Sequence, residues 1–203
     1  MVSEAFSGWT GWAKLAKMEE QRRVEIFSFE HGLDVKDFVN RYMDVVRSAL
    51  DDLWLLIEWE EKGGSLVPSP KGLRQFEKET ERKYLRGLKG WPYSRHYIIM
   101  AVENAYTIIK SWCRRCLKGE APKEKPTPGN YIKIRWPFFH YKDGTVTIPI
   151  KSNGECVSID LRNTPFWDRI SGSKITQIRL EEKKLTIIVR RDVKADPERE
   201  GGV

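Results

Sequence analysis

The sequence predicts an α+β protein in which a small antiparallel β-barrel receives a three-helix insertion after its first strand. A short alternating segment comes first, and three helix-like periodicities follow it. All later regular segments alternate with the two-residue period of half-buried strands. A lone strand separated by helices from the other strands is typical of a sheet or barrel that contains a helical insertion.

The chain divides into six predicted parts. They are an N-terminal lead-in (1–22), the first barrel strand (23–31), the helical insertion (32–117), a Lys/Pro linker (118–130), the remaining antiparallel barrel (131–192) and a polar tail (193–203). The prolines of the linker exclude both a helix and a central strand, so the linker marks the main boundary.

Capping residues and glycines delimit the three predicted helices. Asp34 is the expected N-cap of the first, which ends before Gly63 and Gly64. The second helix spans about 70–88, and the third follows Ser94, its expected N-cap, and ends near 117. Strands are expected at 131–136, 138–141, 145–150, 156–161, 175–180 and 185–190, with an Asp143-Gly144 hairpin turn.

The charge balance favours a polyanionic partner. The 203 residues contain 36 Lys and Arg against 29 Asp and Glu, for a net charge of +7. Three cysteines form no regular disulfide framework, which indicates a reducing compartment and makes the cytoplasm the expected location. No apolar run is long enough to span a membrane, so no membrane partner is expected.

Motifs for catalysis or metal binding are missing from the sequence. Cys113 and Cys116 have zinc-like spacing but no second pair, so structural or incidental roles are expected and no metal is assigned. The chain has no Walker loop, nucleophile elbow or dinucleotide fingerprint, and its carboxylate pairs fall on solvated faces. We therefore expect no cofactor and no enzymatic activity.

Cations and aromatic rings cluster in three places, and this clustering predicts nucleic-acid binding. For any single residue the simpler interpretation is a core ring or a solvated charge. The predicted binding residues are Arg82, Lys83, Arg86, Lys89, Trp91, Tyr93 and Arg95 near the second helix boundary, Lys110, Arg114, Arg115 and Lys118 at the third helix, and Lys133, Arg135 and Trp136 after the linker.

Strand periodicity separates the last of these groups into two faces. Lys133 and Arg135 are expected on one face, with Ile132, Ile134 and Trp136 on the other. The two cations are therefore predicted to be exposed together and to contact phosphates, while Trp91, Tyr93 and Trp136 are candidate rings for base stacking.

Five segments together resemble a known family. They are VEIFSFEHGLDVKDFVNRYMDVVRSALDDLWLL, HYIIMAVENAYTIIKSWCRRC, KGEAPKEKPTPGNYIKIRWP, KDGTVTIPI and ITQIRLEEKKLTIIVRRD, which span most of the chain as patterns of residue types. In this order they resemble the N-terminal half of the transposon-encoded TnpB (OrfB) proteins, which are RNA-guided nucleases related to type V CRISPR effectors.

The resemblance implies a wedge-type, OB-like barrel interrupted by a helical recognition lobe that holds guide RNA and the guide–target duplex. The nuclease acids of that family lie further downstream, whereas this sequence ends after RRDVKADPEREGGV. The resemblance therefore implies a non-catalytic module whose partners are RNA, DNA and a separately encoded nuclease or other protein.

Two other functions remain open at the level of sequence. Trp9, Trp12 and Trp59 are consistent with a protein-interaction or assembly subunit that docks through a tryptophan-rich surface. A metal-dependent nuclease whose acids come together only in the folded chain is a third hypothesis, which cleavage of labelled DNA or RNA in Mg²⁺ or Mn²⁺ tests.

Overall fold

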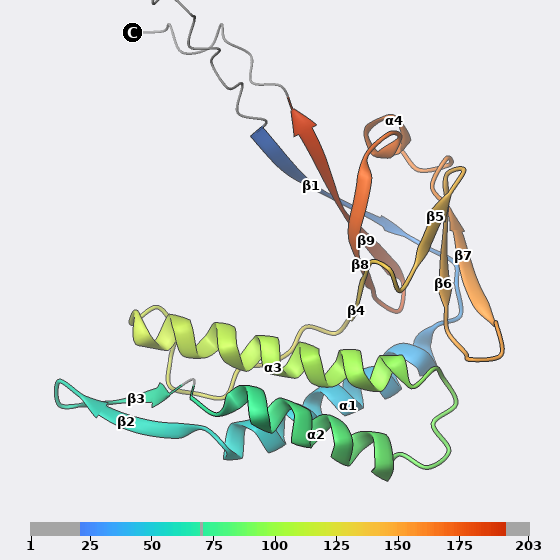
Figure 1. Cartoon of the computed structure of the whole chain (residues 1–203). Coiled ribbons are helices and arrows are strands. Elements are labelled where there is room, and N and C mark those ends of the chain that lie inside the picture. The colour runs from blue at the N-terminus through green and yellow to red at the C-terminus, as the bar shows by residue number, and fades with distance from the viewer. Residues whose placement is uncertain (1–20, 70, 194–203) are drawn as a thin grey trace, which may run out of the picture.

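A computed structural model describes residues 21–69 and 71–193 of the chain. The elements in chain order are β1 (Gln21–Glu30), α1 (Lys36–Leu55), β2 (Glu58–Lys62), β3 (Ser65–Ser69), α2 (Leu73–Gly87), α3 (His96–Leu117), β4 (Ile132–Arg135), β5 (His140–Lys142), β6 (Thr145–Pro149), β7 (Cys156–Asp160), α4 (Trp167–Ile170), β8 (Lys174–Leu180) and β9 (Lys184–Val193). The three long helices and the β2–β3 hairpin lie at one end of the molecule, and the other strands lie at the opposite end (Figure 1).

The helices α1, α2 and α3 pack against one another because each has an apolar stripe at helical spacing. Neither predicted capping side chain is used, since Val35 and Arg95 occupy the N-cap positions without side-chain caps. Ser94 contributes its carbonyl, which accepts a hydrogen bond from the Tyr97 amide at 3.0 Å. None of the helices in the described part of the chain is long and apolar enough to cross a membrane.

The β2–β3 hairpin lies where the sequence indicated only the end of a helix and a turn. Gly63 and Gly64 both have positive φ, of 57° and 76°, and so form the tight turn between the two strands. Trp59 on β2 packs edge-on against Trp54 and Trp112, with ring centroids 6.2 and 6.0 Å apart. Trp59 thus contacts two other tryptophans but stays 39% exposed. The other two tryptophans of the docking hypothesis, Trp9 and Trp12, lie outside the described residues.

The antiparallel strands expected after the linker are present, but they form two sheets. One has the order β1-β9-β8-β4, in which β1 pairs with β9 along its whole length although the helices separate them in sequence. The other has the order β5-β6-β7. The mixed α+β class is confirmed, whereas the expected closed barrel is not found among the described strands.

The two sheets and the helices contribute to one buried core. The start of α3 is joined to the end of β6, because the Tyr97 hydroxyl donates to the Pro149 carbonyl at 2.6 Å and the Ser94 amide donates to the Ile150 carbonyl at 2.9 Å. At the other end of β6, the predicted Asp143-Gly144 turn is confirmed by positive φ at both residues, 49° and 79°.

Candidate nucleic-acid interface

One face of the four-stranded sheet is basic, because cross-strand pairing aligns cations from three strands. Lys133 on β4 is opposite Arg179 on β8, and Lys174 on β8 is opposite Arg190 on β9. Arg135 lies two residues from Lys133 and so faces the same side. We call these residues, Lys133, Arg135, Lys174, Arg179 and Arg190, the basic sheet face.

The opposite face of the same sheet is apolar. Ile132 and Ile134 of β4 are fully buried, as is Ile178 of β8 between Gln177 and Arg179. The predicted separation of Lys133 and Arg135 from the two isoleucines is therefore confirmed. Trp136, which was expected on the side of the isoleucines, instead follows the end of β4 and is 65% exposed. Burial of the isoleucines fixes the register of these strands, since a slip of one residue would expose them and bury the cations.

Acidic groups near the basic sheet face are few. Glu103 of α3 accepts two hydrogen bonds from the Arg135 guanidinium, at 2.8 and 2.7 Å. No ion pair joins Lys133, Lys174, Arg179 or Arg190 to an acidic side chain that the structure describes. The face therefore has a surplus of positive charge.

Arg179 and Lys133 are in environments that an anion would stabilise. The Arg179 guanidinium lies 5.2 Å from the centre of the Tyr131 ring, and its Nε is buried without a hydrogen-bond acceptor. Burial, together with the positive charges of Arg179 and Arg135, lowers the pKa of Lys133 from its ordinary value. A buried unpaired donor is uncommon in folded proteins, and an anion close to the guanidinium would stabilise its positive charge.

Helix α3 extends this charged surface. Glu103 and Thr107 of α3 line a crevice of about 40 Å³ together with Lys133 and Arg135, and it is too small for a nucleotide. Lys110 lies seven residues after Glu103, which is about two turns along the same side of the helix. Its ammonium lies 5.5 Å from the centre of the Tyr106 ring. The structure thus places the predicted residue Lys110 along the same side of α3 as Glu103.

Three of the residues predicted near the second helix boundary make contacts within the fold. Lys83 forms an ion pair with Asp52 at 2.7 Å. The Tyr93 hydroxyl donates to Asp37 at 2.7 Å, and the Trp91 indole donates to the Ser94 carbonyl at 3.2 Å. Both rings are half-buried, so they have little free surface for base stacking.

The other predicted cations are exposed but dispersed. They lie on α2, on α3 and in the segments that follow these helices, and they stay predictions: Arg82, Arg86, Lys89, Arg95, Arg114, Arg115 and Lys118. The structure brings Lys133 and Arg135 together with three residues that the sequence analysis missed, Arg179, Lys174 and Arg190. Their spacing along the last two strands was visible in the sequence, but the face to which each belongs was not.

The two cysteines with zinc-like spacing lie inside the fold. Cys113 and Cys116 are buried, and the Cys116 thiol donates to the Pro122 carbonyl at 3.3 Å. Burial raises the pKa of Cys113 to about 11, so its thiol is protonated at neutral pH. Within residues 21–69 and 71–193, no three His, Cys, Asp or Glu side chains are arranged to hold a metal ion.

Comparisons with known proteins identify related sequences. The model of the uncharacterized protein MJ0013 family matches residues 38–149, from α1 to β6. A TnpB-like protein of Methanocaldococcus jannaschii, MJ1635, is 24% identical over 161 residues, which cover 78% of this chain and 37% of that protein. The uncharacterized protein MJ0013 of the same organism is 24% identical over 148 residues, which cover 63% of this chain and 90% of that protein. The chain thus spans little more than a third of the TnpB-like relative and most of the other.

Proposed function

This chain belongs to the uncharacterized protein MJ0013 family, and on that premise we propose that it is a non-catalytic nucleic-acid-binding module of a TnpB-like, transposon-associated system. The similarity to a TnpB-like protein supports the transposon association. The observation that supports nucleic-acid binding most directly is the basic sheet face, where five cations from three strands share one side of the sheet and, among the described residues, only Arg135 is paired with an acidic side chain.

The proposed contacts are to the phosphate backbone. Arg179 and Lys133 provide donors for phosphate oxygens, and Arg135 is held beside them by Glu103. Ile188 and Ile26 follow Gln177 across the strands, and the Tyr131 ring lies against the Arg179 guanidinium. This face therefore binds without reading base sequence. The ligands we propose are RNA and RNA–DNA duplexes.

Fluorescence anisotropy with a structured RNA, single-stranded DNA, duplex DNA and an RNA–DNA hybrid, each over a salt series, tests this function. Three phosphate contacts are expected to give a slope of about −3 for log K against log salt. We expect RNA or the hybrid to bind more tightly than duplex DNA. Weak binding of all four ligands with little salt dependence would contradict it.

The pH dependence of binding reports on Lys133. A bound phosphate favours the ammonium and so raises the lowered pKa of Lys133 toward its ordinary value of 10.5. The bound state then holds the proton more tightly than the free state, so affinity is highest below the lowered pKa and falls as pH rises through it. Anisotropy titrations across alkaline pH measure this fall.

The Lys133→Arg variant is the matched control, because its guanidinium stays charged over the same range. Its affinity is expected to fall less between neutral pH and pH 10 than that of the wild type. An identical pH profile for the two proteins would remove Lys133 from the interface.

A further inference from the structure

A second hollow lies beside the basic sheet face and differs from it in chemistry. It has a volume of about 540 Å³, and it is lined by residues from the segment 136–142 and from the start of β8. Binding sites for small molecules in proteins typically measure about 300–1,000 Å³, so the space is sufficient for one nucleotide. Lys174 belongs both to this hollow and to the basic sheet face, so the two are contiguous.

The lining combines an apolar floor, a free aromatic ring and cations. Phe139 and Ile175 are buried beneath the hollow. Trp136 is 65% exposed, although tryptophan is usually well buried and its ring is the strongest stacking surface among side chains. Lys142 and Lys174 are exposed at the rim and have no ion pair with a side chain in the described part of the chain.

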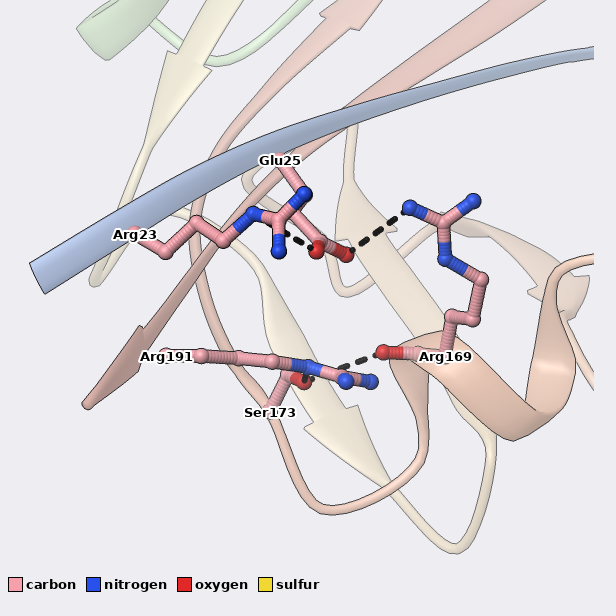
Figure 2. A network of polar contacts seen from close by, with 5 residues as sticks. All are labelled: Arg23, Glu25, Arg169, Ser173 and Arg191. Carbon is pink, nitrogen blue, oxygen red and sulfur yellow. Dashed lines mark hydrogen bonds and ion pairs between the residues drawn. The ribbon is translucent and has the colours of Figure 1, made fainter. Parts of the chain in front are cut away.

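A network of polar contacts fixes the wall formed by Ser173 (Figure 2). The Ser173 hydroxyl accepts a hydrogen bond from the Arg191 guanidinium at 2.6 Å and donates one to the Arg169 carbonyl at 3.1 Å. Arg169 in turn pairs with Glu25 at 3.3 Å, and Arg23 approaches the same carboxylate at 3.4 Å. Ser173 is only 8% exposed, so the segment leading to Lys174 is held in place before any ligand binds.

We propose that this hollow binds one unpaired nucleotide, with its base stacked on Trp136 and its phosphate between Lys142 and Lys174. The assignment rests on the proposed function, since the nucleotide belongs to the nucleic acid whose backbone lies on the basic sheet face. It adds a preference: a ligand with an unpaired base next to a duplex fills both sites, whereas a fully paired duplex fills only the basic sheet face.

A direct test uses AMP and ribose 5-phosphate, which share a phosphate but differ in the base. Titration into ¹⁵N-labelled protein is expected to shift the Trp136 indole signal and the Ser173–Lys174 amide signals with AMP, and to shift the indole much less with ribose 5-phosphate. Equal shifts with both compounds, or none with AMP at millimolar concentration, would overturn the nucleotide site. This readout does not depend on binding to the basic sheet face.

The Trp136→Ala variant tests the same site with longer ligands. Loss of one base stack is expected to weaken binding of a hairpin RNA with an unpaired 3′ extension by about tenfold, because a stack is worth about 1–3 kcal/mol. Binding of the blunt hairpin is expected to change less than twofold. Trp136→Phe, which keeps a ring, is expected to retain most of the affinity, and circular dichroism checks that both variants are folded.

The outcomes separate the two proposals. AMP binding without salt-dependent binding of any duplex would contradict the basic sheet face and leave the nucleotide site standing. Salt-dependent binding of duplexes would leave the proposed function standing. If Trp136→Ala then weakens binding of both hairpins equally, or of neither, the nucleotide site is overturned.

Discussion

The double variant Lys133→Ala/Arg179→Ala is expected to bind RNA and the RNA–DNA hybrid about 100-fold more weakly than the wild type at low salt. The two side chains face each other across β4 and β8, and each is expected to donate to a phosphate oxygen. A hydrogen bond to a charged group contributes about 1.5 kcal/mol or more, which is roughly tenfold in affinity for each residue.

The salt dependence makes this prediction specific. Removal of two phosphate contacts is expected to reduce the slope of log K against log salt by about 2, and to weaken ligands of different sequence to the same extent. Anisotropy titrations at several salt concentrations measure both quantities.

A charge-matched variant separates local contacts from the loss of net charge. Lys62→Ala/Lys78→Ala also removes two positive charges, but from the β2–β3 hairpin and from α2. It is expected to reduce affinity only slightly. Equal losses in the two double variants would mean that general electrostatic attraction, and not the basic sheet face, accounts for binding.

The Trp112→Ala variant is expected to lower the free energy of unfolding by about 3–5 kcal/mol, the usual cost of deleting a large buried aromatic side chain. Trp112 is 1% exposed and packs against Trp54 with ring centroids 4.8 Å apart. Its indole also donates to the Pro122 carbonyl at 3.0 Å, so the ring fixes the beginning of the linker against α3. Urea unfolding followed by circular dichroism measures the change.

Trp59→Ala provides the comparison within the same aromatic cluster. Trp59 is 39% exposed and contacts the edge of Trp112, so its removal creates less of a cavity. The expected loss is clearly smaller than that of Trp112→Ala. Similar losses would show that the hairpin is as important to the stability of the helices as the buried ring is.

The position of Trp112 also bears on the predicted linker. The composition of residues 118–130 excludes regular structure, and no helix or strand is found there. Pro122 nevertheless accepts hydrogen bonds from both Trp112 and Cys116, so this part of the linker is anchored to α3. Sequence composition predicted the lack of secondary structure, but these contacts depend on packing and could not be predicted from it.

The β2–β3 hairpin was not predicted from the sequence, because its strands have an unfavourable composition. Its strands contain Glu58, Glu60 and Glu61, and acidic residues are unfavourable in strands. Trp59 supplies the compensating interaction, because its ring reaches Trp54 and Trp112 on two helices. The tertiary contact thus overrides local propensity, and for that reason periodicity alone did not reveal these strands.

The sequence by itself determined the elements whose periodicity was clear, namely the three long helices, the first strand and the antiparallel strands after the linker. It also placed Lys133 and Arg135 on the exposed side of β4, because alternation with Ile132 and Ile134 requires it. These features depend on interactions between near neighbours in the chain, which the order of residues specifies directly.

Only the tertiary structure decided how the strands are grouped and which cations meet. The strands form two sheets instead of a barrel, and β8 contains a register shift between Ile175 and Gln177. Lys174 and Arg179 are five residues apart, so regular alternation would place them on opposite faces. The extra residue of the shift brings both to the face of Lys133. Pairing between distant strands, which no local pattern specifies, therefore created the basic sheet face.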